Sequence, residues 1–340
     1  MVELLKRLCT AKGVSGREEN VCALIRDEIA DYADSVTIDV NNNVIATVGD
    51  TSVHNIMLDA HLDEIGFIVT YIDDNGFVKV SQSGGMDYRV ANDTRFKILT
   101  SSGELTAVVC CLPPHLSDGG EDKAPDKDAV YLDTGLPAEK VRSLVSLGDT
   151  VAYDVPPLSL LNGRFSCCST DNRACCALLI RVAELIRKNP VRSGVTFAFT
   201  SQEETYGRGA MTAAFKTQPD EAISVDVSFA SQGGVAEYES GKLGGGGMIC
   251  ISPVLSRKMS YRFITLAKEN GIPYQLEVVG GRTGTNADRI SVSGSGIPTA
   301  LVSVPQRNMH TGAEIVSLDD IESTAQLIYQ YIKSADQFAS

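Results

Sequence analysis

The sequence has no apolar run close to the roughly 18 residues that a membrane-spanning helix requires. Its first residues, MVELLKRLCTAKG, are too polar for a secretory signal peptide. We therefore expect a cytoplasmic protein that has no membrane partner.

The sequence also lacks an excess of positive charge. Its 30 Lys and Arg residues face 43 Asp and Glu residues, which gives a formal net charge of −13. Such a chain repels phosphate backbones, so nucleic acid is excluded as an expected partner. Hydrophobic residues make up 43% of the chain and charged residues 21%, which excludes the disordered class.

No CxxC spacing occurs, although the chain has nine cysteines. This absence argues against a cysteine-bound zinc site and a redox motif. We expect reduced thiols that are mostly buried, because free cysteine packs like a small apolar side chain. Six of the nine lie in adjacent pairs: Cys110 and Cys111, Cys167 and Cys168, and Cys175 and Cys176.

At 340 residues the chain is too long for one typical core, so we expect one large domain and a smaller one. Short alternating segments broken by Gly, Asn, Asp and Pro occupy about residues 64–154 and predict a compact inserted β domain. The Gly-rich run at 242–247 lacks the GK[ST] ending of a phosphate-binding loop and is expected to be a flexible loop.

Outside the insertion, apolar runs typical of buried strands alternate with segments of helical period, which predicts an α/β fold with a mostly parallel sheet covered on both faces. Ser15 and Glu18 fit a capping box at the start of the second helix. The expected helices are residues 3–9, 17–33, 172–188, about 207–217, 256–270 and 319–338, and the expected strands are 53–60, 194–200, 222–227, 274–279 and 299–304.

Candidate metal ligands stand where these elements end or begin. Open α/β sheets gather such positions into one crevice. Two imidazoles and three carboxylates form a donor set that zinc, cobalt or manganese accepts, and a bridging carboxylate would hold two ions about 3.5–4 Å apart. The candidates are His61, Glu203 or Glu204, Asp226 and His310, which come at or after strands, and Asp171, which precedes a helix.

Two further roles follow from spacing. Neighbouring Glu203 and Glu204 cannot point the same way on an extended backbone, so one can bind a metal while the other acts as general base. Asp63 lies two residues from His61 and can orient its imidazole. Each feature is ordinary by itself, because single histidines usually pack, Glu pairs are usually solvated and an Asp before a helix usually caps it.

Read in order, these segments resemble the glutamyl and tetrahedral aminopeptidase family of zinc exopeptidases, which has also carried a cellulase-like label. The resemblance spans nearly the whole chain. It is carried by TAKGVSGREENV near the N-terminus, LDAHLDEIGF at 58–67, LPPHL at 112–116, YLDTG at 131–135, STDNRAC at 169–175, TSQEE with RGA at 200–210, SVDVS at 224–228 and VPQRNMHTGAE at 304–314.

The resemblance implies a role for each position. His61 and Asp226 would bind one zinc, Glu204 and His310 would bind the other, and Asp171 would bridge them. Glu203 would be the general base and Asp63 the orienting acid.

The family also implies a fold and an assembly. The fold is a three-layer zinc-exopeptidase sandwich formed by residues 1–63 and 158–340, with a β-barrel-like dimerisation domain at 64–157. The implied assembly is a homo-oligomer in which dimers build a dodecamer. The implied activity is release of N-terminal residues from peptides.

Departures from the family pattern cluster on the substrate side. EETYGRGA stands where the family usually reads EEVGLRGA, and Asn308 and Thr311-Gly312 flank the last histidine where Tyr and Ser-Pro are usual. We expect metal binding to persist while the substrate pocket differs. The alternatives are a metal-dependent deacylase or deblocking enzyme, a glucan hydrolase, and a scaffold with a vestigial site, which the complete ligand set disfavours because buried carboxylates are costly.

Overall fold

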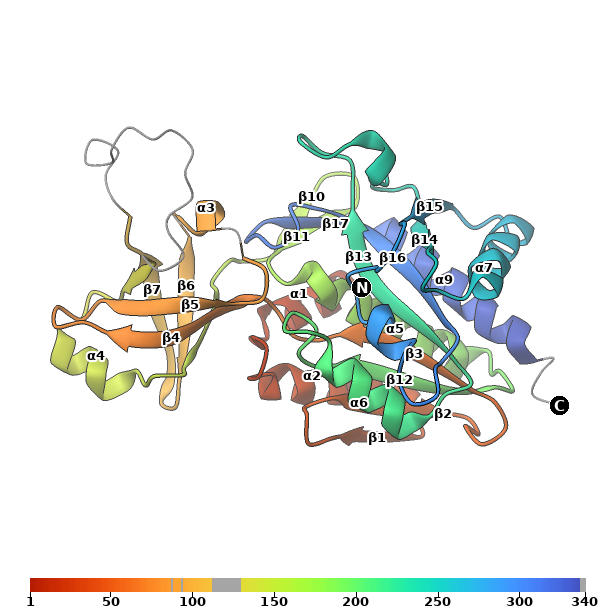
Figure 1. The fold of residues 1–340 in the computed structure, drawn as a ribbon, viewed down its shortest axis with the longest axis horizontal. Helices are drawn as coiled ribbons and strands as arrows, with labels where there is room; N and C mark the ends of the chain where they lie inside the picture. The colour runs from red at the N-terminus through yellow and green to blue at the C-terminus, as the bar shows by residue number, and fades with distance from the viewer. Residues whose placement is uncertain (87, 93, 112–129, 337–340) are drawn as a thin grey trace.

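The computed structural model describes residues 1–86, 88–92, 94–111 and 130–336. The LPPHL segment at 112–116, which carries part of the family resemblance, lies outside these residues. Figure 1 shows a larger body, in which helices surround a twisted sheet, and a smaller lobe of β-strands beside it.

The larger body is built on an 11-stranded sheet with the order β1-β2-β12-β3-β13-β16-β17-β11-β10, and β14 and β15 attach to it beside β16. The strands are β1 (Ser35–Ile38), β2 (Val44–Val48), β3 (Asn55–His61), β10 (Leu158–Leu160), β11 (Arg164–Cys167), β12 (Gly194–Thr200), β13 (Glu221–Phe229), β14 (Gly247–Ile251), β15 (Tyr274–Val278), β16 (Thr299–Arg307) and β17 (Glu314–Ser317).

The sheet is mixed. Its four central strands, β12, β3, β13 and β16, run parallel to one another, as does the β14–β15 pair. The other neighbouring strands pair antiparallel. The predicted mostly parallel sheet is therefore correct for the central strands and wrong for the sheet as a whole, because the edge strands return through short hairpin-like connections that sequence periodicity does not orient.

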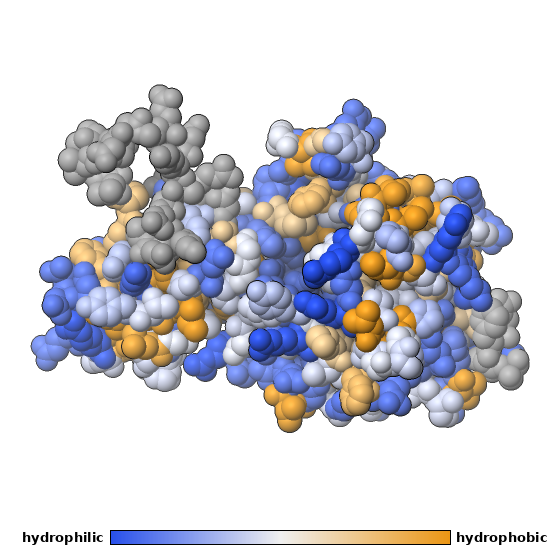
Figure 2. All heavy atoms as spheres, viewed as in Figure 1, coloured by the Kyte–Doolittle hydropathy of each residue, from blue (hydrophilic) through white to orange (hydrophobic). Residues whose placement is uncertain are grey.

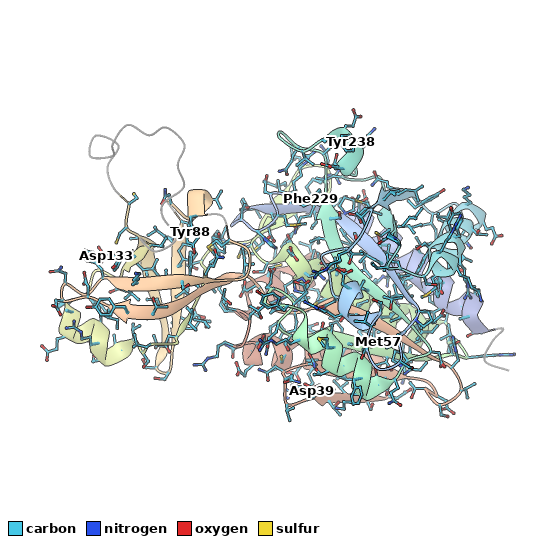
Figure 3. All side chains as sticks on the ribbon, viewed as in Figure 1. Asp39, Met57, Tyr88, Asp133, Phe229 and Tyr238 are labelled. Carbon is cyan, nitrogen blue, oxygen red and sulfur yellow. The ribbon has the colours of Figure 1, made fainter. Side chains whose placement is uncertain are left out.

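Helices cover both faces of this sheet. Ile56 and Leu58 of β3 pack into the core that includes α5 and α9, whereas Met57 packs against α6 and α8, as its place in Figure 3 illustrates. This division follows from the alternation of side chains along a strand. The helices on the first face are α1 (Val2–Thr10), α2 (Glu19–Ile29), α5 (Thr170–Lys188), α7 (Arg257–Glu269) and α9 (Leu318–Ala335), and those on the second are α6 (Arg208–Thr217) and α8 (Ala287–Ile290).

The predicted capping box at Ser15 and Glu18 is wrong. The helix α2 has no side-chain cap, and Ser15 Oγ instead donates a hydrogen bond to Asp63. The carboxylate of Glu18 accepts a hydrogen bond from the Gly16 N–H at 2.6 Å. Ser15 therefore contacts the buried carboxylate of Asp63 instead of capping α2, although its sequence pattern is common at helix starts.

The smaller lobe is a closed antiparallel barrel with the order β4-β5-β8-β7-β6-β9. Aromatic rings pack against one another in its core: Phe96 meets Phe67 edge to face with 5.3 Å between ring centroids, and its ring is tilted against that of Tyr153 at 4.8 Å. The barrel lies between β3 and β10 in the chain. Its elements are β4 (Gly66–Ile72), β5 (Val78–Ser83), α3 (Tyr88–Ala91), β6 (Arg95–Thr100), β7 (Gly103–Val109), β8 (Tyr131–Asp133), α4 (Ala138–Leu144) and β9 (Thr150–Tyr153).

The Gly-rich run at 242–247 is anchored rather than free. The N–H groups of Gly244 and Gly246 each donate a hydrogen bond of 2.7 Å to the carboxylate of Asp320. Gly247 opens β14, and a Cβ there would lie 2.4 Å from Thr324 Oγ1. The glycines thus permit close packing against α9, and the strand that follows them is one that the sequence did not predict.

The nine cysteines are free, and seven of them are buried, which confirms the prediction of reduced, mostly buried thiols. Within the described part of the chain, no helix has the length and apolar character needed to cross a membrane. The expected location of the protein in the cell stays a prediction.

Candidate metal centre

Side chains from five separate segments converge at the carboxyl ends of the central parallel strands. His61 ends β3, and the pair Glu203 and Glu204 follows β12. The neighbouring strands place these segments side by side although they are far apart in the sequence (Figure 1). The cavity that they line has a volume of about 870 Å³ and includes His61, Asp171, Glu203, Glu204, Asp226 and His310.

Asp171 lies between the two histidines. Its Oδ1 is 3.1 Å from His61 Nε2, and its Oδ2 is 3.4 Å from His310 Nε2. On the first side, Asp226 Oδ1 lies 3.7 Å from His61 Nε2, and on the second, Glu204 Oε1 lies 3.4 Å from His310 Nε2. The structure thus brings together two groups of ligand atoms, each with one histidine and one carboxylate, that share Asp171.

The Nδ1 atom of each histidine faces away from this cluster. His61 Nδ1 lies 3.2 Å from the carbonyl oxygen of Asp63 and 3.4 Å from its Oδ1. His310 Nδ1 lies 2.7 Å from the carbonyl oxygen of Gly85, in the segment that follows β5 of the barrel. Because these oxygens can only accept a hydrogen bond, they favour a proton on Nδ1 and leave the Nε2 lone pair directed at Asp171.

Asp63 is fully buried and connects three segments of the site. Its carboxylate accepts hydrogen bonds from the backbone N–H groups of Glu203 at 2.9 Å and Glu204 at 3.2 Å, and from Ser15 Oγ. The two glutamates lie in a turn, so the extended backbone assumed for them is wrong. The carboxylates of Glu203 and Glu204 both lie near His61. They differ in that Glu204 also contacts His310.

The pKa values of the cluster are shifted because several carboxylates lie close together and are largely shielded from solvent. Burial raises the pKa of Glu203 well above its usual range and that of Asp226 to about 8. Burial opposes a charge on His310, but its contacts with Asp171 and Glu204 outweigh this and raise its pKa to about 12. The cluster therefore attracts positive charge strongly.

These residues fit divalent metal ions. Buried carboxylates are costly unless cations or hydrogen bonds neutralise them. Here the buried carboxylates of Asp171, Asp226 and Glu204, together with the half-buried Glu203, surround two imidazoles whose Nε2 atoms point inward. Nitrogen and oxygen donors of this kind suit zinc, cobalt and manganese. The donor set can therefore hold metal ions on both sides of Asp171.

Sequence reasoning missed Glu314, which organises the same cluster. This buried side chain accepts hydrogen bonds of 3.0 Å from the N–H groups of Asp171 and His310 and from Thr170 Oγ1. Burial raises its pKa well above the usual range. Its position four residues after His310 gave no local signal, because its partner Asp171 lies 143 residues away.

The contribution of the barrel was also missed. A Cβ at Gly85 would lie 3.1 Å from His310 Nδ1, and one at Gly84 would lie 3.1 Å from the Cβ of Glu204. The barrel backbone therefore approaches the metal centre closely at two consecutive glycines. The Gly-Gly doublet in SGGM was the available signal, since adjacent glycines often mark a close backbone approach.

Comparison with known proteins places this architecture among aminopeptidases. The family model of the M42 glutamyl aminopeptidase matches residues 42–327. The lysyl aminopeptidase of Pyrococcus furiosus is 31% identical over 330 residues, which cover 96% of this chain and 94% of the relative.

Two solved structures extend the comparison. An aminopeptidase from the archaeon Desulfurococcus kamchatkensis superposes with a TM-score of 0.93 at 29% identity, covering 100% of this chain and 96% of the other. The TET1 peptidase of Pyrococcus horikoshii, which can assemble into a tetrahedron or a large octahedral shell, superposes with a TM-score of 0.86 at 30% identity, covering 97% and 98%.

Proposed function

Because the chain belongs to the M42 glutamyl aminopeptidase family and is a metal-dependent aminopeptidase, we propose that two divalent metal ions occupy the cluster around Asp171. The position of Asp171 between His61 and His310 is the observation that carries this proposal. Zinc is the proposed native metal, and cobalt or manganese is the alternative, because all three accept imidazole and carboxylate donors.

Each residue has a proposed role. One metal would be held by His61 and Asp226, the other by Glu204 and His310, and Asp171 would bridge them. Asp63 would orient His61 through its Nδ1 atom, at the contact described above. The carbonyl oxygen of Gly85, in the barrel segment after β5, would likewise favour the form of His310 that carries its proton on Nδ1.

Metal ions bound in this arrangement would polarise the scissile carbonyl and lower the pKa of a water between them. Glu203 is proposed as the general base, because it lies within the cluster and has no contact with His310 like that of Glu204. Its Oε atom would accept a proton from the water and then donate it to the leaving amine. Burial, which raises the pKa of this carboxyl, strengthens it as a proton acceptor.

The substrate class is tested with peptides that differ only at their N-terminus. We expect release of the first residue from a free tripeptide and no release from its N-acetylated form. Removal of metal should abolish the activity, and zinc, cobalt or manganese should restore it. Cleavage of the acetylated peptide in preference to the free one would instead favour a deacylase, and activity that survives complete metal removal would exclude the metal mechanism.

The proposed assembly is a homo-oligomer in which dimers build a dodecamer. We place the dimer contact on the barrel domain, at residues 64–157, against a catalytic domain of residues 1–63 and 158–340. Support comes from apolar side chains exposed on the barrel, and Figure 2 shows hydrophobic surface on this lobe as well as on the body. Ile68, Tyr71, Phe77 and Val108 are among them.

Sedimentation of the wild-type protein and of Tyr71→Ser tests this assembly. We expect a mass that corresponds to twelve subunits for the wild type and smaller species for the variant. A monomeric wild type would contradict the assembly without bearing on the metal centre.

A further inference from the structure

Beyond the metal centre, one face of the sheet forms a continuous floor to the cavity. Asp226 of β13 lies opposite Ser303 of β16, Ser303 lies opposite Met248 of β14, and Cys250 of β14 lies opposite Glu277 of β15. Residues opposite one another on neighbouring strands point to the same face. The floor therefore leads from the metal ligand Asp226 to the carboxylate of Glu277, and all five residues line the cavity.

Glu277 is a partly buried carboxylate held by hydroxyl groups rather than by a cation. Ser228 Oγ donates to it at 2.5 Å, and Ser303 Oγ donates at 3.4 Å. Among the described residues, no ion pair includes Glu277. Burial raises the pKa of Glu277, because the two hydroxyl donors replace only part of the hydration that its carboxylate loses. A cationic group bound next to this carboxylate would stabilise its charged form.

The stretch of floor before Glu277 is apolar. Met248, Cys250 and Leu301 line it and are buried. We propose that this part of the cavity binds the side chain of the substrate's N-terminal residue and selects a basic one, lysine above all. The methylene groups of lysine would lie along Met248 and Leu301, and the ammonium group would reach Glu277. The inference rests on the proposed aminopeptidase function and names its substrate class.

Two arginines also line the cavity and could favour an acidic residue instead. Arg282 is engaged by Asp288, with Nε 3.6 Å from Oδ2. Arg289 belongs to the short helix α8, and its side chain packs beside Gly207 on the wall. Glu277 lies on the same sheet face as Asp226, whereas Arg289 does not belong to this sheet. The charged group on the floor next to the metal centre is therefore the carboxylate of Glu277 and not an arginine.

The contribution of the ammonium group can be isolated by comparing lysyl and norleucyl p-nitroanilides, which share the same chain length. We expect the wild-type enzyme to have a kcat/KM about 10- to 100-fold higher for the lysyl substrate, the range expected of a hydrogen bond between charged groups. Glu277→Gln should bring the two values within about threefold, chiefly by lowering the lysyl value. Arg289→Gln should leave the ratio at its wild-type value.

The outcomes separate the two proposals. Hydrolysis of norleucyl or glutamyl substrates without preference for lysine would overturn this inference and leave the aminopeptidase function intact. The same holds if Glu277→Gln, with an unchanged melting temperature, retains the wild-type ratio. Hydrolysis of none of these substrates with any of the three metals would overturn the proposed function itself.

Discussion

The carboxylate of Glu314 accepts a hydrogen bond from the backbone N–H of His310, with 3.0 Å between N and Oε1. Its other oxygen accepts one from the N–H of Asp171 at the same distance. One buried side chain thus fixes the backbone of a proposed ligand on one metal and of the proposed bridge. Support of this kind matters because ligand orientation determines metal affinity.

Replacing Glu314 by Ala should weaken metal binding by about 10- to 100-fold, with a similar loss in kcat/KM. The reason is that both N–H groups lose their acceptor and His310 is free to move. Titration with a chelating indicator measures the affinity, and Glu314→Gln, which keeps one acceptor oxygen, serves as the control. An affinity in Glu314→Ala equal to that of the wild type would contradict the positioning role.

Gly85→Ala should displace His310, because the new Cβ would lie 3.1 Å and 3.3 Å from ring atoms of that histidine. We expect turnover to fall about tenfold or more while the fold persists, as for small displacements near reacting groups. Gly233→Ala is the matched control, since a Cβ at Gly233 meets nothing within 4 Å. Equal turnover in the two variants would show that the barrel backbone does not position His310.

Removing the metal ions should lower the melting temperature by about 5–10 °C, because ligands that bind only the folded state stabilise it by a few kcal/mol. Physically, the buried carboxylates of Asp171, Glu204 and Asp226 repel one another when no cation lies among them. Differential scanning calorimetry with and without EDTA measures the shift, and zinc-saturated EDTA is the control. An unchanged melting temperature would argue against occupation of the cluster by metal.

Glu18 provides a pH-dependent stability test. Burial raises its pKa from 4.5 to about 7, so the folded state favours the neutral form. This contribution to stability is fully present below pH 4.5 and is lost as the pH rises through 7, by an amount on the order of 3 kcal/mol. The side chain in Glu18→Gln stays neutral at every pH. The melting temperature of this variant relative to that of the wild type should therefore be higher at pH 8 than at pH 5.

The neighbouring exposed residue supplies the control for that test. Glu19→Gln should show no such gain between the two pH values, because Glu19 is exposed. If Glu18→Gln tracks the wild type at both pH values, the carboxyl group of Glu18 is not destabilised by burial.

The sequence predicted the central strands and the convergence of the proposed metal ligands, because both follow from the local pattern of apolar and polar residues. His61 comes at the end of an apolar strand, and Asp226 lies in another, so a parallel arrangement of these strands places both at one edge of the sheet. The helices α5, α6, α7 and α9 were also predicted within a few residues, because long segments with helical period are the clearest local signal.

What the sequence did not predict depends on contacts between distant segments. Gly85 and His310 are 225 residues apart, and no periodicity links a barrel turn to the last histidine. Ser15 fits a helix cap by its local sequence, whereas its actual partner, Asp63, lies on another segment. The strand β14 was missed because it follows three glycines and begins with a fourth, Gly247, whose need for close packing against Thr324 is visible only in three dimensions.

The most direct test of the dinuclear mechanism compares the metal content and turnover of two variants, Glu203→Gln and Glu204→Gln. The two substitutions remove the charge from neighbouring residues of the same turn. We expect Glu203→Gln to bind two ions per subunit, as the wild type does, and to lose turnover by about 10²–10⁴-fold, the range typical of general bases. Glu204→Gln should lose the ion next to His310. Near wild-type turnover in Glu203→Gln, or full metal content in Glu204→Gln, would contradict these roles.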